Sequence, residues 1–323
     1  MAIGIISGSF VPGTAHALQK GQFVGVSVPI GNCWATWLLV MMYPTLCKVR
    51  YETLHGLFSH RGIWKQVAFS VFMNWIVAPF LRLALAWASL PDKPELRTGL
   101  ILVGLGRCIA MVLIWTGLAS GDNEDCAVLV AINSILQMVL SAPLAVFFIR
   151  IISHKSGPLN VSYEVVATSI GTYLNIPLGD TILSRFGLRA LDGPQWYEKV
   201  FLRFVAPWST ILVLFAYQGQ QVVHQIVSVL RVSVPLIVYF VVIFFLTLWT
   251  THRCGFGYAL SVTQSFTAAS NNFELAIAVA TATYDPNSDQ ALASTVGPLV
   301  EVPVLLGLVY VVKCIGNRWA WKV

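Results

Sequence analysis

Long apolar segments follow one another along the chain, and this pattern restricts the possible fold more than any other feature of the sequence. Nine of them have the length that a helix needs to cross a bilayer, about 20 residues. They are residues 24–47, 66–90, 98–119, 126–149, 164–184, 199–217, 232–250, 258–284 and 290–312. Only 11% of all residues are charged, against about 25% in soluble domains. The sequence therefore predicts an all-α polytopic membrane protein.

One further apolar segment, residues 2–12, precedes these nine and is counted as the first of ten. It is too short for a span, and we interpret it as the end of a first helix that is cut short. Ten helices divide into two groups of five. A five-helix unit that is repeated once must insert in the opposite orientation, as in many secondary transporters. We therefore expect two inverted repeats, residues 1–155 and 156–323, in which segments 98–119 and 258–284 correspond.

The charges and cysteines exclude several classes of protein. The net charge of +6 comes from basic residues in loops, so it does not indicate nucleic-acid binding. Twelve Lys and Arg residues lie on one side of the predicted topology and six on the other, which places both termini in the cytoplasm. The six cysteines show no C-x-x-C pair and no zinc spacing. Because no P-loop is present, we do not expect ATP-driven transport by this chain alone.

The stretch 265–282 places polar residues inside the ninth apolar segment. Ser270, Asn271 and Asn272 precede the acid Glu274, and an apolar run follows. A carboxylate at membrane depth costs roughly 2.5–3.5 kcal/mol, so a functional role is the default interpretation. Small polar residues favour a helix that breaks and restarts inside the protein. Asn271 with Glu274 three residues later resembles a capping box, and the alternative is that Glu274 only caps a helix.

The fourth segment, 98–119, has a similar interruption. Two glycines are followed by Arg107 and Cys108, and then by a second apolar run. A cation beside a thiol is unusual at this depth. Cys108 is therefore a candidate soft-metal ligand, although it could simply be a small packed residue. Arg107 could instead pair with Glu274 or Glu301 across the bundle.

Polar residues also recur on one face of the fifth segment. Asn133, Gln137 and Ser141 are spaced by four, so they share a helix face that should point into the bundle. Hydrogen bonding between helices explains this stripe as well as contact with a substrate does.

Glu301 lies in the tenth segment between two prolines that kink a helix. It is either a second proton site or a partner of Arg82 or Arg107, and we favour a structural pairing. The acidic loop 121–125 lies at the end of a span, and we expect it to be solvated.

Several long stretches resemble one family of membrane proteins. They include GLGRCIAMV in the fourth segment and SNNFELAIAVA in the ninth, and in full they cover residues 41–52, 97–115, 118–125, 265–280 and 296–309. At these residues the chain resembles an arsenite efflux permease of the arsenical-resistance family, in the bile/arsenite/riboflavin transporter superfamily. The resemblance implies broken fourth and ninth helices that cross, and export of As(III) hydroxide, or antimonite, in exchange for protons. The functional pair of the family falls on Cys108 and Glu274.

From this pair and the chemistry of arsenite we expect a division of roles. Cys108 is the expected As(III) ligand and Glu274 the expected proton carrier, with no cofactor besides the proton. Three asparagines are expected to contact the substrate hydroxyls, namely Asn133, Asn271 and Asn272. Arg107, Gln137 and Glu301 are expected to support the site. We expect no nucleic acid and no stable protein partner, a plasma-membrane location in the lipid bilayer, and a separate arsenate reductase in the same pathway.

Two other functions fit parts of the pattern. In a sodium-coupled organic-anion carrier of the same superfamily, the asparagines and Glu274 would bind Na⁺ and Cys108 would be incidental. A membrane-embedded enzyme would need paired catalytic groups, but the six histidines all fall in or near loops without such partners. The chain departs from the family at Gly106, where relatives often have Ala, and at Thr116, where many have Asn.

Overall fold

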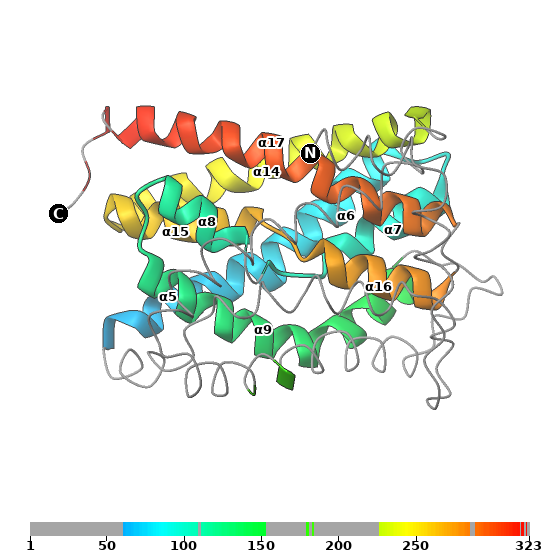
Figure 1. Ribbon diagram of the computed structural model, residues 1–323, viewed down its shortest axis with the longest axis horizontal. Coiled ribbons are helices and arrows are strands. Elements are labelled where there is room, and N and C mark those ends of the chain that lie inside the picture. The colour runs from blue at the N-terminus through cyan, green and yellow to red at the C-terminus, as the bar shows by residue number, and fades with distance from the viewer. Residues whose placement is uncertain are drawn as a thin grey trace.

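The computed structural model describes residues 61–108, 111–152, 179–180, 183, 226–284, 288–316, 318–319 and 321. Within these ranges every regular element is a helix, and the long helices lie side by side along the long axis of the molecule (Figure 1). Four helical segments are long and apolar enough to cross a membrane, namely Ile63–Ser89, Asn123–Ile149, Val227–Arg253 and Asp289–Gly316. The prediction of an all-α membrane protein is confirmed for this part of the chain.

The third predicted span is a single helix with a π-helical turn in its middle. It consists of α5 (Arg61–Phe72), η2 (Met73–Val77) and α6 (Ala78–Ser89). Pro79 supplies no backbone donor, so the regular hydrogen-bond pattern is interrupted one turn before it, where the π turn lies.

Three further spans match the predicted segments and are longer by a few residues. They are α9 (Asn123–Val146), which continues as η3 (Phe147–Ile152), α14 (Ile226–Arg253) and α17 (Asp289–Gly316). The predicted segments 2–12, 24–47 and 199–217, and nearly all of 164–184, lie outside the described residues. The number of ten helices and the two repeats therefore stay predictions.

The acidic loop before α9 has a structural role that the sequence did not indicate. The Asp122 side chain accepts hydrogen bonds from the amides of Glu124 (2.9 Å) and Asp125 (3.1 Å), which makes it the N-cap of the helix. The Asp122 backbone also bonds the Thr263 hydroxyl, through its amide at 2.9 Å and its carbonyl at 3.2 Å. The loop is exposed at Glu124 and partly exposed at Asp122, as expected, and Asp122 has the capping role in addition.

The fourth and ninth segments are both interrupted, as predicted. The fourth consists of α7 (Pro94–Val103) and α8 (Met111–Leu118), and the ninth of α15 (Tyr258–Ala269) and α16 (Phe273–Thr283). In Figure 1, α8 and α15 lie toward the left end of the molecule and α7 and α16 toward the right end. In each interrupted segment the two half-helices therefore extend in opposite directions from a break near the middle of the molecule.

Glycines let α17 pack closely against these half-helices. A Cβ at Gly99 of α7 would collide with the Gln290 carbonyl oxygen, and one at Gly297 of α17 would overlap the Phe273 ring of α16. Small residues at such contacts are how membrane helices approach one another. The contact at Phe273 matters for the site because it holds the first residue of α16.

We expect Gly297→Leu to lower the free energy of unfolding by about 1–3 kcal/mol, because the new side chain must displace the Phe273 ring. The matched control is Gly307→Leu in the same helix, since a Cβ at Gly307 meets no atom within 4 Å. The measurement is thermal unfolding of both variants in detergent. Equal midpoints for the two variants would show that the Gly297 contact is not tightly packed.

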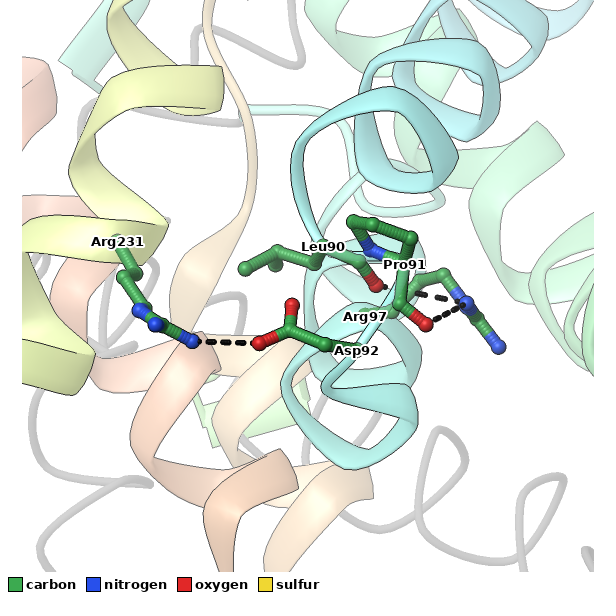
Figure 2. Close-up of polar contacts among 5 residues, drawn as sticks. All are labelled: Leu90, Pro91, Asp92, Arg97 and Arg231. Atoms are coloured by element: carbon green, nitrogen blue, oxygen red, sulfur yellow. Dashed lines mark hydrogen bonds and ion pairs between the residues drawn. The ribbon is translucent and has the colours of Figure 1, made fainter.

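One end of the bundle is fixed by arginines that hold the loop between α6 and α7 (Figure 2). Arg97 donates to the carbonyls of Leu90 (3.4 Å) and Pro91 (3.5 Å), and its guanidinium carbon lies 3.8 Å from the centre of the Trp87 ring. Arg231 of α14 forms an ion pair with Asp92 at 2.7 Å. This pair ties α14 to the loop from outside the core.

The Asp92–Arg231 pair predicts a small dependence of stability on pH. The hydrogen bond from Arg231 lowers the pKa of Asp92. The ion pair therefore contributes to the free energy of unfolding at neutral pH, and this contribution is lost as the pH falls through the lowered pKa. We expect wild type to unfold at a slightly higher temperature than Arg231→Gln at pH 7, with the difference vanishing in acid. The effect is small because both side chains are about half exposed, at 49% and 57%. A difference that grows in acid would contradict this assignment.

Candidate functional site

The breaks of the two interrupted helices lie against each other. Arg107 and Asn271 form an isolated antiparallel β-bridge, and the Asn272 amide donates to the Gly106 carbonyl at 3.1 Å. A Cβ at Gly106 would lie 2.7 Å from the Asn272 carbonyl oxygen, so the missing side chain permits this approach. The family departure at Gly106 therefore falls on the crossing itself. The predicted crossing of the two broken helices is present in the structure.

Four helix ends meet at this crossing, and each has partial charge from unpaired backbone groups. The Asn272 side chain caps α16 by accepting from the Leu275 amide at 3.1 Å. The predicted cap at Asn271 is therefore wrong by one residue, because the backbone of Asn271 is used in the bridge. Glu274 consequently lies in the first turn of α16, where the helix dipole favours a negative charge.

The crossing brings Cys108 to the polar run of the ninth segment. Cys108 directly follows Arg107, whose backbone pairs with Asn271, and its side chain is only 7% exposed. Asn271 and Asn272 are buried, whereas Glu274 is half-buried. The geometry thus gathers a thiol, two amides and a carboxylate from segments that are far apart in the sequence.

Arg107 is held by other groups than the ones we expected. Its guanidinium donates to the Gly104 carbonyl at the end of α7 and to the Tyr239 hydroxyl at 3.3 Å. Its backbone amide donates to the Gln137 side chain. Among the described residues it forms no ion pair with Glu274 or Glu301, so that alternative is not realised. A guanidinium on a helix C-terminal carbonyl offsets the partial negative charge there.

The polar stripe of α9 faces the bundle interior, as predicted, and its members differ in their contacts. Asn133, Gln137 and Ser141 are all buried. Gln137 accepts a hydrogen bond from the Arg107 backbone amide and so contacts the first break, and its supporting role in transport stays a prediction. Asn133 accepts from the Trp75 indole at 3.0 Å, so its oxygen is engaged in a contact between helices.

Glu301 of α17 lies beside the ninth-segment break. Its carboxylate faces the backbone amide of Asn271 and the Ser270 hydroxyl, and it is 5% exposed. Glu301 therefore belongs to the same cluster as the other predicted site residues.

Tyr239 is the site residue that sequence reasoning missed. It is fully buried in α14, accepts from Arg107, and donates to the Ala268 carbonyl at 3.3 Å, so it joins the first break to the end of α15. Arg82 lies flat on the Tyr239 ring. A tyrosine inside an otherwise apolar span, and an arginine inside another, were the signals that could have indicated this contact.

Several buried polar atoms at the crossing have no hydrogen-bond partner among the described residues. They are Ser270 Oγ, Asn271 Oδ1, Asn272 Nδ2, Gln137 Nε2 and Glu301 Oε1. Buried polar groups are nearly always paired, so a cluster of this kind indicates a site for a polar ligand. A small pocket with an almost wholly apolar lining lies next to the first break. None of these polar residues lines it, and its lining is Leu102, Leu105, Gly106, Ser141, Ala145, Leu275, Ala276 and Val279.

Broken helices that cross in the middle of a helical membrane protein, with polar groups gathered at the breaks, define the class of secondary transporters. Comparison with known proteins gives the same class. Residues 35–225 match the family model described as the sodium bile acid symporter family. The chain belongs to this family and, within it, to the Acr3 transporters. It is a membrane transporter and not an enzyme.

Three curated relatives support this assignment over nearly the whole chain. The arsenical-resistance protein Acr3 of Corynebacterium glutamicum is 44% identical over 98% of this chain and 87% of its own length. An uncharacterized transporter of Synechocystis is 30% identical over 97% of this chain and 85% of its own length. The arsenical-resistance protein Acr3 of Alkaliphilus metalliredigens is 28% identical over 95% of this chain and 87% of its own length.

Proposed function

We propose that this chain exports arsenite, and antimonite as a chemical analogue, from the cytosol in exchange for protons. The observation that carries this proposal is the pairing of the two breaks, which brings Cys108 to the run from Ser270 to Glu274. The names of two relatives associate their proteins with resistance to arsenicals.

The chemistry at Cys108 suits a substrate that must also leave. Arsenite is an uncharged trihydroxide near neutral pH and prefers sulfur to oxygen. The Cys108 thiol displaces one hydroxide: an As–S bond forms, an As–O bond breaks, and the hydroxide leaves as water with the thiol proton. Water reverses this step when the substrate is released. A single thiol binds As(III) less tightly than three thiols would, so the substrate can be released and turnover continues.

The remaining hydroxyl groups of arsenite need polar partners. Asn271 Oδ1 and Asn272 Nδ2 are buried at the crossing without partners and supply an acceptor and a donor. Asn133 was expected to share this role, but its bond with Trp75 supports a contribution through helix packing instead.

Glu274 is the proposed proton carrier. It lies in the first turn of α16, directly after the buried Asn271 and Asn272 of the second break, and it is the one acid of that half-helix. The site then binds a proton from the outside and arsenite from the inside in alternation. Each is bound weakly enough to be released, so that the transport cycle continues.

The proposed architecture is two inverted five-helix repeats in the plasma membrane, with both termini in the cytoplasm. The two interrupted helices, whose breaks run antiparallel, support the inverted relation. We propose no cofactor other than the proton and no stable protein partner. A separate arsenate reductase would supply the trivalent substrate.

The deciding experiment is arsenite uptake into everted membrane vesicles that contain the full chain, with an imposed inside-acid pH gradient. The proposal expects uptake that collapses when a protonophore is added. A sodium-coupled organic-anion carrier would instead transport a bile acid under a sodium gradient and ignore the pH gradient. Vesicles with folded protein and no gradient-driven arsenite uptake would overturn the proposal.

A further inference from the structure

The hydroxyl group of Tyr239 on α14 bonds to both interrupted segments. It accepts a hydrogen bond from the Arg107 guanidinium at 3.3 Å and donates one to the Ala268 carbonyl at 3.3 Å. Arg107 lies in the first break, and Ala268 lies in the last turn of α15, just before the second break. One oxygen atom therefore joins the two segments from a third, uninterrupted helix.

These two bonds meet the C-terminal ends of α7 and α15. The Arg107 guanidinium also donates to the carbonyl of Gly104, the C-cap residue of α7, and the Ala268 carbonyl is one of the last four of α15. Such carbonyls have no partner within their helix and carry partial negative charge. The guanidinium and the hydroxyl therefore link the two helix ends. Cys108 directly follows Arg107, and Asn271 follows Ala268 by three residues.

The ring of Tyr239 has a separate contact with Arg82 of α6. The Arg82 guanidinium carbon lies 3.5 Å from the ring centre, and both residues are fully buried. Because the guanidinium nitrogens of Arg82 have no hydrogen-bond partner among the described residues, the face of the ring stabilises this cation. The substitution Tyr239→Phe keeps the ring and removes only the hydroxyl, so it separates the two contacts.

We propose that Tyr239 is a positioning residue, whose hydroxyl holds Arg107 and the end of α15 in register and so keeps Cys108 beside the polar residues of the second break. The backbone bonds at Arg107 and Gly106 join the breaks to each other, whereas the Tyr239 hydroxyl ties both of them to α14. Groups that bind one ligand together must be held to within about 0.5 Å of the productive geometry. The consequence for transport rests on the proposed function, and the placement of Cys108 does not.

The first test measures the placement of Cys108 without any substrate. Purified full-length wild type and Tyr239→Phe are treated with N-ethylmaleimide in detergent, and the modification rate of each cysteine is followed by peptide mass spectrometry. Cys108 is 7% exposed, so its modification reports local opening of the crossing. We expect Tyr239→Phe to accelerate modification of Cys108 about tenfold. The rate at Cys126, which is buried in α9, should not change.

Tyr258→Phe is the matched control because it removes the same group at the other end of the same half-helix. Tyr258 is the first residue of α15, and its hydroxyl donates to the carbonyls of Ala119 at 3.1 Å and Val312 at 3.5 Å. This variant should lower the thermal unfolding midpoint, as Tyr239→Phe does, but Cys108 should react at the wild-type rate.

Three results of this test would overturn the proposal. They are an unchanged Cys108 rate in Tyr239→Phe, an equal acceleration of Cys108 and Cys126 in that variant, and an acceleration of Cys108 in Tyr258→Phe. The second result would mean that the hydroxyl only contributes to global stability. The third would mean that any lost hydroxyl in α15 or its contacts loosens the crossing.

Arg107→Lys is a second variant, which decides the proposal if Tyr239→Phe does not fold. Lysine keeps the positive charge but lacks the fork of donors that bonds the Gly104 carbonyl and the Tyr239 hydroxyl together. The same selective acceleration of Cys108 is expected. In the double variant the acceleration should fall short of the product of the two single ones, because both changes break one shared bond. Accelerations that multiply would contradict action through Arg107.

The second test measures arsenite uptake by everted vesicles over a range of arsenite concentrations. Tyr239→Phe should raise KM about tenfold with little change in the maximal rate per folded protein, because displaced binding groups weaken substrate binding and the proposed proton carrier is unchanged. Tyr258→Phe should keep the wild-type KM. A loss confined to the maximal rate of Tyr239→Phe would contradict positioning of the binding groups. No uptake by wild type would be a failure of the proposed function, and the thiol modification would still decide the placement of Cys108.

Discussion

Arsenite uptake by Cys108→Ala vesicles is expected to fall to the level of vesicles that lack the protein. The thiol is the one sulfur ligand that the described residues bring to the crossing. The amides of Asn271 and Asn272 alone bind a neutral hydroxide no better than water does. The measurement is initial uptake rate under an inside-acid gradient, normalised to the amount of folded protein.

Cys314→Ser is the matched control, because Cys314 is exposed near the end of α17 and far along the helix from the crossing. It should transport at the wild-type rate. Full transport by Cys108→Ala would discard the sulfur mechanism and leave a transporter that recognises its substrate through oxygen and nitrogen atoms alone.

Glu274→Gln is expected to abolish the response of arsenite accumulation to the pH gradient. Glutamine keeps the size and the hydrogen-bonding groups of the side chain in the first turn of α16 but cannot exchange a proton. We expect the uptake rate of this variant to be the same with and without the gradient. Arsenite binding, measured separately on purified protein, should persist because Cys108 is unchanged.

The control for this variant is Glu124→Gln, since Glu124 is exposed in the first turn of α9 and outside the crossing. If a Glu274→Gln variant still accumulates arsenite in response to the gradient, another carboxylate carries the proton. Glu301 of α17, which is also buried beside the second break, would then be the next candidate.

The helical spans and the positions of both breaks could be predicted because they depend on local sequence. Hydrocarbon requires each span to satisfy its own backbone, so apolar length alone indicates α9, α14 and α17. Small, polar and glycine residues weaken the helix at 104–108 and at 270–272, and both interruptions are present. The cap of α16 was misplaced by one residue because nothing local shows that Asn271 bonds across to Arg107.

The partners of the buried charges could not be predicted from the sequence. Charge alone suggested that Arg107 pairs with a glutamate, but the structure places it on the Gly104 carbonyl and Tyr239. Which groups meet depends on how α14 and α17 pack around the crossing, and packing is set by shape contacts such as Gly297 on Phe273. A hydropathy pattern does not show which residues pack against one another.

The sequence by itself therefore determined the class of protein, the positions of the spans that the structure describes, and the choice of Cys108 and Glu274 as candidates. Tertiary structure alone decided that the two breaks pair through Arg107 and Asn271, and that Tyr239 lies between the two buried arginines. The physical reason is that helix formation in a membrane is satisfied within each segment, whereas a transport site is made of groups that only the packing of several segments brings within bonding distance.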